Sequence, residues 1–157
     1  MTASALEHYE ELETYIRQYR AGDTAVLSIV REGESLEVEV ELIRAPMQAR
    51  EMKKYRNDDF EFTVRDITFF DKAEEQWQED QQGVLVEQVN SGGWAALGGL
   101  ESNSLILEVD ASAIADVDAL EAQMKRVAEE KPGAVVFKVL RGIHTAYIEL
   151  EPKWDLD

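Results

Sequence analysis

The sequence predicts an α+β fold in which helices precede or separate β-hairpins. Several short segments alternate apolar and charged residues, which is the pattern of strands with one buried face. Two longer segments place apolar residues three to four positions apart, as amphipathic helices do. Glycine, proline and aspartate fall between these segments, where turns require them.

The first 46 residues are predicted to form one helix followed by a β-hairpin. The helix runs from Ala5 to Arg20, and Gly22 after it is a residue type that commonly ends helices. The segment from Thr24 to Ile43 contains two strand-like stretches with a turn between them. The apolar residues that share one face are Leu6, Tyr9, Leu12, Ile16 and Tyr19 in the helix and Leu36, Val38, Val40 and Leu42 in the second strand.

Residues 47–59 change in character and are predicted to be a linker. They show no clear apolar period and contain the one basic cluster of an acidic chain, which consists of Arg50, Lys53, Lys54 and Arg56. A solvated linker is the favoured interpretation of this cluster, and a binding patch is the alternative.

Strands and helices follow in order from residue 60. The alternation in "FEFTVRDIT" predicts a strand over 60–68. Asp116 is a favourable N-cap for a helix over 117–130, which a Pro-Gly pair ends. The other predicted elements are a short helix over 69–82, strands over 83–89 and 104–110, a helical turn over 94–100 and a closing hairpin over 134–152.

The end of the chain repeats part of its beginning. Arg31 and Arg141 lie 110 positions apart, and Val38 matches Ile148 at the same spacing. The helix breaks "RAGD" and "KPGA" also match to within one residue. Self-similarity of this kind marks a repeated module. Because only the last part of the module occurs at the start, we expect the chain to begin partway through a module and to be a fragment of a longer protein.

Residues 60–153 resemble a PDZ domain of the bacterial HtrA/Deg type, in which the strand order is permuted. Three stretches carry the resemblance: "FTVRDIT", similar to the carboxylate-binding strand; "GVLVEQVNSGGWAALGGLESNSLILEVD", similar to a strand, a small-residue helix and the next strand; and "DVDALEAQMKRVAEEKPGAVVFKVLRG", similar to the groove helix and its following strand. The resemblance implies a small, partly open β-barrel or sandwich capped by two helices. Residues 1–46 resemble the last helix and hairpin of a preceding module.

Three positions depart from the family pattern. Glu61 stands where the carboxylate loop usually has a glycine, which lets main-chain amides converge on a peptide carboxylate. Asn103-Ser104 replaces a Gly-Asp pair, and Ala111 replaces a turn glycine. We expect Glu61 to oppose a negatively charged ligand, whereas asparagine tolerates the left-handed conformation and preserves its turn.

The resemblance implies a non-catalytic module that binds extended segments or protein C-termini by β-strand addition. The parent protein would be an HtrA-like serine protease or another PDZ-containing protein, and the HtrA-like case would place it in the periplasm or cell envelope. The alternative is a scaffold module for oligomerisation whose groove is occupied by its own chain or a neighbour's. The implied groove residues are Phe60, Glu61, Phe62, Thr63 and Val64 on the strand and Leu120, Glu121 and Met124 on the helix.

The stretch "NSGG" raises the alternative of a trypsin-type nucleophile at Ser91. Such a loop needs a glycine before the asparagine to build the oxyanion hole, and Val89 stands there. The two histidines, His8 and His144, lie in no protease-like context. We therefore predict a turn that caps the short helix, and no catalytic residue. The residues expected to fold inward behind this turn are Trp94 and Leu97.

Composition limits the partners. The net charge of −17 disfavours nucleic acid and anionic membrane surfaces. No apolar run approaches the roughly 20 residues of a membrane helix. The chain has no cysteine, and no metal site or cofactor is predicted. An unpartnered apolar face on the half module predicts that this module packs either on the chain's own PDZ-like domain or on the half module of a second chain. The second outcome is favoured and gives a homodimer through residues 5–43.

Overall fold

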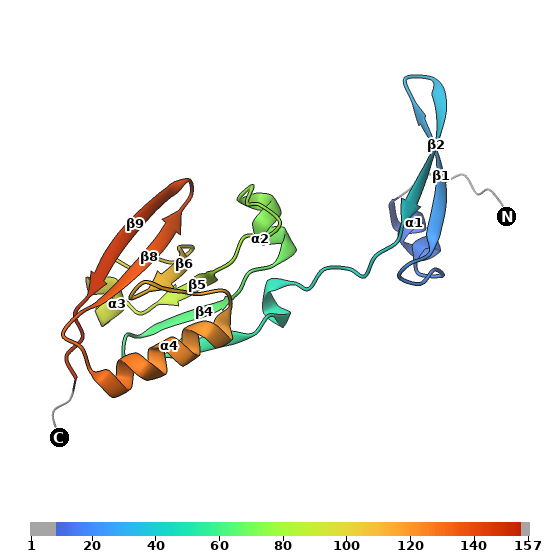
Figure 1. Cartoon of the computed structure of the whole chain (residues 1–157). Coiled ribbons are helices and arrows are strands. Elements are labelled where there is room, and N and C mark those ends of the chain that lie inside the picture. The colour runs from blue at the N-terminus through green and yellow to red at the C-terminus, as the bar shows by residue number, and fades with distance from the viewer. Residues whose placement is uncertain (1–8, 155–157) are drawn as a thin grey trace. The chain divides into compact units, whose positions relative to one another are not determined.

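The computed structural model describes residues 9–154 and divides the chain into two compact units, Met1–Ala45 and Pro46–Asp157. Each unit has its own antiparallel sheet (Figure 1). Sheets of this kind with a few helices confirm the predicted α+β class. Within the described part of the chain, no helix has the length and apolar character that crossing a membrane requires.

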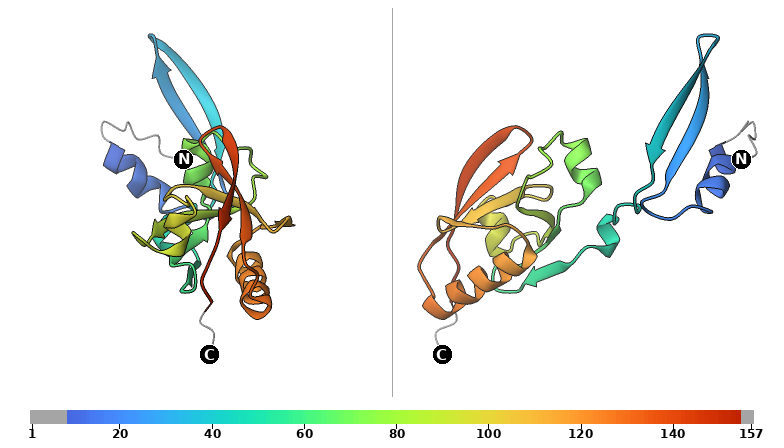
Figure 2. Two further views of the ribbon diagram at one scale, coloured as in Figure 1. Left: turned by 90° about the vertical axis from the view of Figure 1, so that its left-hand side faces the viewer. Right: turned by 45° about the vertical axis from the view of Figure 1, so that its right-hand side comes forward.

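The first unit consists of α1 (Tyr9–Ile16), β1 (Thr24–Arg31) and β2 (Glu34–Glu41) (Figure 2). The predicted order of helix and hairpin is confirmed. The helix ends earlier than predicted, because the amides of Gln18 and Tyr19 bond to carbonyls three residues back and tighten the chain into turns. Leu6 and the other predicted helical residues before Tyr9 lie outside the described residues.

The hairpin of the first unit carries an apolar face. The strand register pairs Leu27 with Val38 and Ile29 with Leu36, so these four side chains lie on one side. The predicted grouping of the β2 residues is therefore confirmed. Leu36 is 55% exposed and Ile29 of β1 is 41% exposed, which agrees with the predicted exposed apolar face of this hairpin.

The second unit is built on one antiparallel sheet, whose strands differ widely in length. The hydrogen-bonded order is β3-β4-β5-β6-β8-β9, every pair is antiparallel, and β7 pairs with β6. The strands are β3 (Lys54–Asn57), β4 (Phe62–Asp66), β5 (Val84–Val89), β6 (Leu105–Val109), β7 (Ser112–Ala113), β8 (Val135–Arg141) and β9 (His144–Leu150). The helices are η1 (Ala49–Glu51), α2 (Phe69–Glu74), α3 (Trp94–Leu97) and α4 (Val117–Glu130).

The core of the second unit lies between this sheet and α4. The ring of Phe62 meets that of Phe137 edge to face, with centroids 5.9 Å apart. Leu120 and Met124 of α4 are buried against the same cluster. Each such side chain contributes about 1.5–3 kcal/mol through burial, so the apolar face of α4 holds the helix against the sheet.

Two boundaries in the second unit differ from the sequence predictions. The helix predicted over 69–82 ends at Glu74, because Gln76 adopts a left-handed conformation with φ of 57°. The linker predicted over 47–59 is wrong in its second half, since Lys54–Asn57 form β3. By contrast, α4 spans the predicted residues, and the Asp116 side chain accepts the predicted capping bond from the Ala119 amide at 2.8 Å.

Candidate functional site

The edge of β4 that faces α4 is paired with β3. The register joins Lys54 to Arg65 and Asn57 to Phe62, so all four residues of β3 oppose β4. Helix α4 packs against both strands. This edge is where the resemblance places a bound peptide, and here a segment of the chain itself lies there.

The eight predicted groove residues are brought together on β4, its preceding loop and α4. Most of them serve the core: those with at most 1% exposure are Phe60, Phe62, Val64, Leu120 and Met124. The other three, Glu61, Thr63 and Glu121, are half-buried and lie nearer the surface.

The loop before β4 has an unusual backbone at Glu61, whose φ is 62°. This left-handed conformation is the one that glycine adopts easily and other residues adopt at a cost of about 1 kcal/mol. The loop is held by two main-chain bonds, from Asn90 N to Glu61 O and from Ala95 N to Phe60 O, both at 3.0 Å. A Cβ at Gly93 would lie 2.6 Å from Glu61 Oε2, so Gly93 leaves room for the glutamate.

Asn57 joins the end of β3 to this loop. Its side chain is 4% exposed, and its Oδ1 accepts a hydrogen bond from the Phe60 main-chain amide at 2.8 Å. Its Nδ2 donates to Tyr55 Oη at 3.1 Å. Burial raises the pKa of the Tyr55 phenol, and the charges of Glu121 and Asp59 raise it further. The inward side chains of β3 are therefore an aromatic ring and an amide that bonds the loop.

The outward side chains of this segment make ion pairs with the walls around it. Lys54 Nζ lies 2.8 Å from Glu87 Oε1 of β5, and Lys53 pairs with Asp118 in the first turn of α4. The hydrogen bond that Lys53 donates to Asp118 raises the pKa of Lys53, and the charges of Glu121 and Asp66 act in the same direction. The four residues of the basic cluster are exposed, as predicted for a solvated segment, and two of them, Lys53 and Lys54, also pair with carboxylates of α4 and β5.

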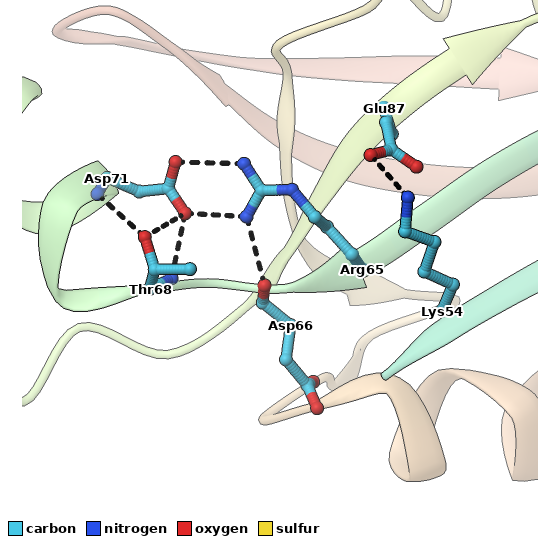
Figure 3. Close-up of polar contacts among 6 residues, drawn as sticks. All are labelled: Lys54, Arg65, Asp66, Thr68, Asp71 and Glu87. Carbon is cyan, nitrogen blue, oxygen red and sulfur yellow. Dashed lines mark hydrogen bonds and ion pairs between the residues drawn. The ribbon is translucent and has the colours of Figure 1, made fainter. Parts of the chain in front are cut away.

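A polar network fixes the far end of β4 (Figure 3). Both terminal nitrogens of Arg65 contact the Asp71 carboxylate, at 2.6 and 2.9 Å, and Thr68 closes a capping box with Asp71. Burial by itself raises the pKa of the Asp71 carboxyl. The hydrogen bonds from Arg65 and Thr68 outweigh that effect and lower this pKa to about 2. The network anchors α2 to β4 and shapes the end of the groove away from the loop.

A cavity of about 430 Å³ lies at the loop before β4. Its lining combines three carboxylates with two indole rings: the residues are Asp58, Asp59, Glu61, Trp94, Pro152, Lys153 and Trp154. Glu61 is expected to repel a negatively charged ligand, and Asp58 and Asp59 add two more carboxylates to the same cavity.

The predicted turn at Ser91 is present. A neighbour of Ser91 in this turn, Gly93, is the N-cap of α3, without a side-chain hydrogen bond. Leu97 is 69% exposed, so its predicted inward position is wrong, whereas Trp94 packs against the core. His144 is exposed at the start of β9, and His8 lies outside the described residues. In the described part of the chain, no group of three or more metal-ligating side chains gathers.

Sequence reasoning missed Tyr55 and Asn57, although the basic residues beside them form the predicted cluster.

No model of a known protein family matches the chain. It is 22% identical over 148 residues to the periplasmic pH-dependent serine endoprotease DegQ of Escherichia coli strain K12. That match covers 94% of this chain and 30% of DegQ, so the chain spans less than a third of this relative.

Two solved structures are similar in fold. A variant of the HtrA-type protease AlgW with a decapeptide is 24% identical, with a TM-score of 0.50 over 64% of this chain and 29% of AlgW. The HtrA3 PDZ domain bound to a phage-derived ligand, FGRWV, is 20% identical, with a TM-score of 0.47 over 66% of this chain and 88% of HtrA3 PDZ.

Proposed function

We propose that this chain, whose second unit has the fold of an HtrA-type PDZ domain, binds extended peptide segments by β-strand addition. The observation that carries the proposal is the pairing of β3 with β4, in which the edge of β4 beside α4 holds an antiparallel strand of the same chain. Main-chain hydrogen bonds supply affinity in this mode of recognition, and side-chain pockets supply selectivity.

The eight predicted residues would act in three ways. The main chain of Phe62, Thr63 and Val64 would pair with the ligand, and Phe60 with Glu61 would form the loop at its end. The helix wall would consist of Leu120, Glu121 and Met124. Phe62 and Leu120 are buried, which supports two roles for them: they pack in the core, and by doing so they fix the positions of β4 and α4 beside the ligand.

The experiment is a titration of the ¹⁵N-labelled full chain with unlabelled decapeptides that differ in charge and C-terminal group. Binding by strand addition should shift the amide signals of 62–66 and 117–124 and leave those of 24–41 unchanged. Affinities should be micromolar or weaker, because a short strand buries little area. Shifts confined to other surfaces, or no shifts with any peptide, would contradict the proposed function.

The longer protein to which this segment corresponds would be a protease in which this domain is an accessory part. The similarity of this chain to DegQ supports that proposal. The described second unit itself is a PDZ fold and not a protease domain.

A second proposal concerns oligomerisation and rests on the hairpin of the first unit. Its exposed apolar face would pair with the same face of a second copy across a two-fold axis, giving a homodimer through residues 5–43. Of the four paired side chains, Leu36 and Ile29 are exposed, whereas Leu27 and Val38 are half-buried. Light scattering of the full chain that gives 17.8 kDa at every concentration would contradict the dimer.

A further inference from the structure

We propose that β3 is a tethered ligand of the groove, so that an incoming peptide must displace residues 54–57, and that the groove selects a basic segment with an aromatic residue. This inference rests on the proposed function. It adds a competitor built into the chain and a chemical class for the ligand.

The main chain of β3 occupies the positions that strand addition requires. All four of its residues oppose β4, from Lys54–Arg65 to Asn57–Phe62. At the loop end, Asn57 Oδ1 takes the hydrogen bond of the Phe60 amide. A ligand strand would need the same edge and the same amide. Two strands cannot pair with one edge at once, so β3 and a free peptide exclude each other.

The side chains of β3 define what the groove recognises. Alternation along a strand places Tyr55 and Asn57 on the inner side and Lys54 and Arg56 on the outer side. Tyr55 packs against the core cluster, and Asn57 is buried. The segment thus presents an aromatic ring to the protein and positive charges to the rim.

The rim of the groove is acidic on both sides. Lys54 meets Glu87 of β5, Lys53 meets Asp118 of α4, and the charge of Glu121 also acts on Lys53. A free segment with lysine or arginine on both sides of an aromatic residue would find the same partners. Glu121 is already paired with Lys125 at 3.2 Å, so a neutral segment would leave Glu87 and Asp118 without a cation. An acidic segment would, in addition, be repelled by a chain of net charge −17.

The loop end of the groove favours an internal segment over a free C-terminus. Asp58, Asp59 and Glu61 line the cavity there with one cation, Lys153, so a terminal carboxylate would add a fourth negative charge beside a single positive charge. The tethered strand meets this condition, because the chain continues from Asn57 into Asp58 and ends in no carboxylate.

The ion pairs that hold β3 are weak enough for a free peptide to displace this strand. The ion pairs that hold its rim are exposed, with side-chain exposures of 52% and 71% for Lys53 and Asp118, and exposed pairs contribute roughly 0–1 kcal/mol each. The tether is the stronger restraint, since a short linker gives an effective concentration in roughly the millimolar range. Loss of the tethered strand should therefore strengthen binding of a free peptide by a large factor.

The experiment locks β3 in place in the full chain, which has no native cysteine. Arg56 and Thr63 are directly opposed, so Arg56→Cys with Thr63→Cys brings two thiols together across the strands. The probe is a fluorescein-labelled peptide amide with the sequence Lys-Lys-Tyr-Arg-Asn, measured by anisotropy. The oxidised chain should bind it at least about tenfold more weakly than the same chain after reduction. Equal affinity in both redox states would overturn the tethered ligand.

A release variant and two control peptides complete the test. Tyr55→Ser should bind the probe about fivefold or more tightly than the unmodified chain, because β3 loses its aromatic anchor. Glu-Glu-Tyr-Glu-Asn amide should bind at least about tenfold more weakly than the probe, and Lys-Lys-Ser-Arg-Asn amide should also lose affinity. Equal binding of the acidic peptide would overturn the ligand class.

The outcomes separate the two proposals. Peptide binding that is insensitive to the disulfide but still shifts the amide signals of 62–66 and 117–124 overturns only the tethered ligand. Disulfide-insensitive binding with shifts confined to other surfaces overturns both proposals. Absence of binding by the reduced chain, the Tyr55→Ser chain and the unmodified chain, with every peptide, overturns the proposed function and this inference together.

Discussion

The main-chain amide of Val117 donates a hydrogen bond to Asp66 Oδ1 at 2.7 Å. The bond joins the last residue of β4 to the first residue of α4, so the two walls of the groove are fixed to each other at one end. The Asp66 amide also donates to Lys53 O at 3.1 Å, which places the start of β3 at the same point.

Asp66→Ala is expected to lower the free energy of unfolding by about 1–2 kcal/mol, because the partly buried Val117 amide loses its acceptor. Peptide affinity should fall as well, since the walls are no longer joined. Urea denaturation and anisotropy measure the two effects. The exposed Asp80→Ala is the matched control. Equal losses in both variants would contradict the role of Asp66.

The buried pair of Arg65 and Asp71 should make stability depend on pH in the acid range. The pKa of Asp71 is lowered from 3.8 to about 2 in the folded chain. Its contribution is therefore complete above about pH 4 and is lost as the pH falls towards 2. Arg65→Met should remove about 2 kcal/mol at pH 7 and little at pH 2.

Urea midpoints measured at pH 7 and at pH 2 check this prediction. The control is Arg17→Met, which removes an exposed pair with Glu13 in the first unit. It should change the midpoint little at either pH. A loss in the Arg65 variant of the same size at both pH values would be inconsistent with the lowered Asp71 pKa.

Gly93 and Glu61 are expected to be coupled. Gly93→Ala should destabilise the second unit by about 1–3 kcal/mol, since its Cβ would lie 2.9 Å from Glu61 Cβ. Glu61→Gly should stabilise it by about 1 kcal/mol by relieving the left-handed backbone, and it should make Gly93→Ala tolerated. Thermal unfolding of the four chains gives the coupling. Gly133→Ala is the control, because an added Cβ meets nothing within 4 Å there.

Glu61→Gly should also change the preference for the peptide terminus. In the unmodified chain, an apolar peptide should bind no better as a free acid than as an amide, because three carboxylates line the loop cavity. Removing one of them should tighten binding of the free acid and leave the amide unchanged. Isothermal titration with both peptides measures this, and an equal gain for the amide would contradict the electrostatic explanation.

The proposed homodimer should depend on one face of the hairpin. Leu36→Lys places a charge on the apolar face, whereas Val30→Lys places it on the opposite face of β1, where Val30 is 76% exposed. Light scattering should detect dimers for the unmodified chain and the Val30 variant and monomers for the Leu36 variant. Dimers in all three chains would indicate another interface.

The sequence by itself determined the elements whose signals are local. Helix α4 begins and ends where its apolar period, its aspartate cap and its Pro-Gly end predict. The repeat of the hairpin was also visible, because alternation of apolar and charged residues encodes a strand with one wet face. The acidic loop residue Glu61 was apparent as a departure from the family pattern.

Only the tertiary structure decided what lies in the groove. Lys54–Asn57 is too short for a periodic signal, and its basic residues are typical of a solvated segment. It becomes a strand because β4 offers an unpaired edge, Asn57 bonds the Phe60 amide, and carboxylates from distant elements meet its lysines. Those partners come from β4, the loop, β5 and α4, and folding alone brings them together. For the same reason, the sequence predicts a groove occupied by the chain itself only as the alternative to an open groove.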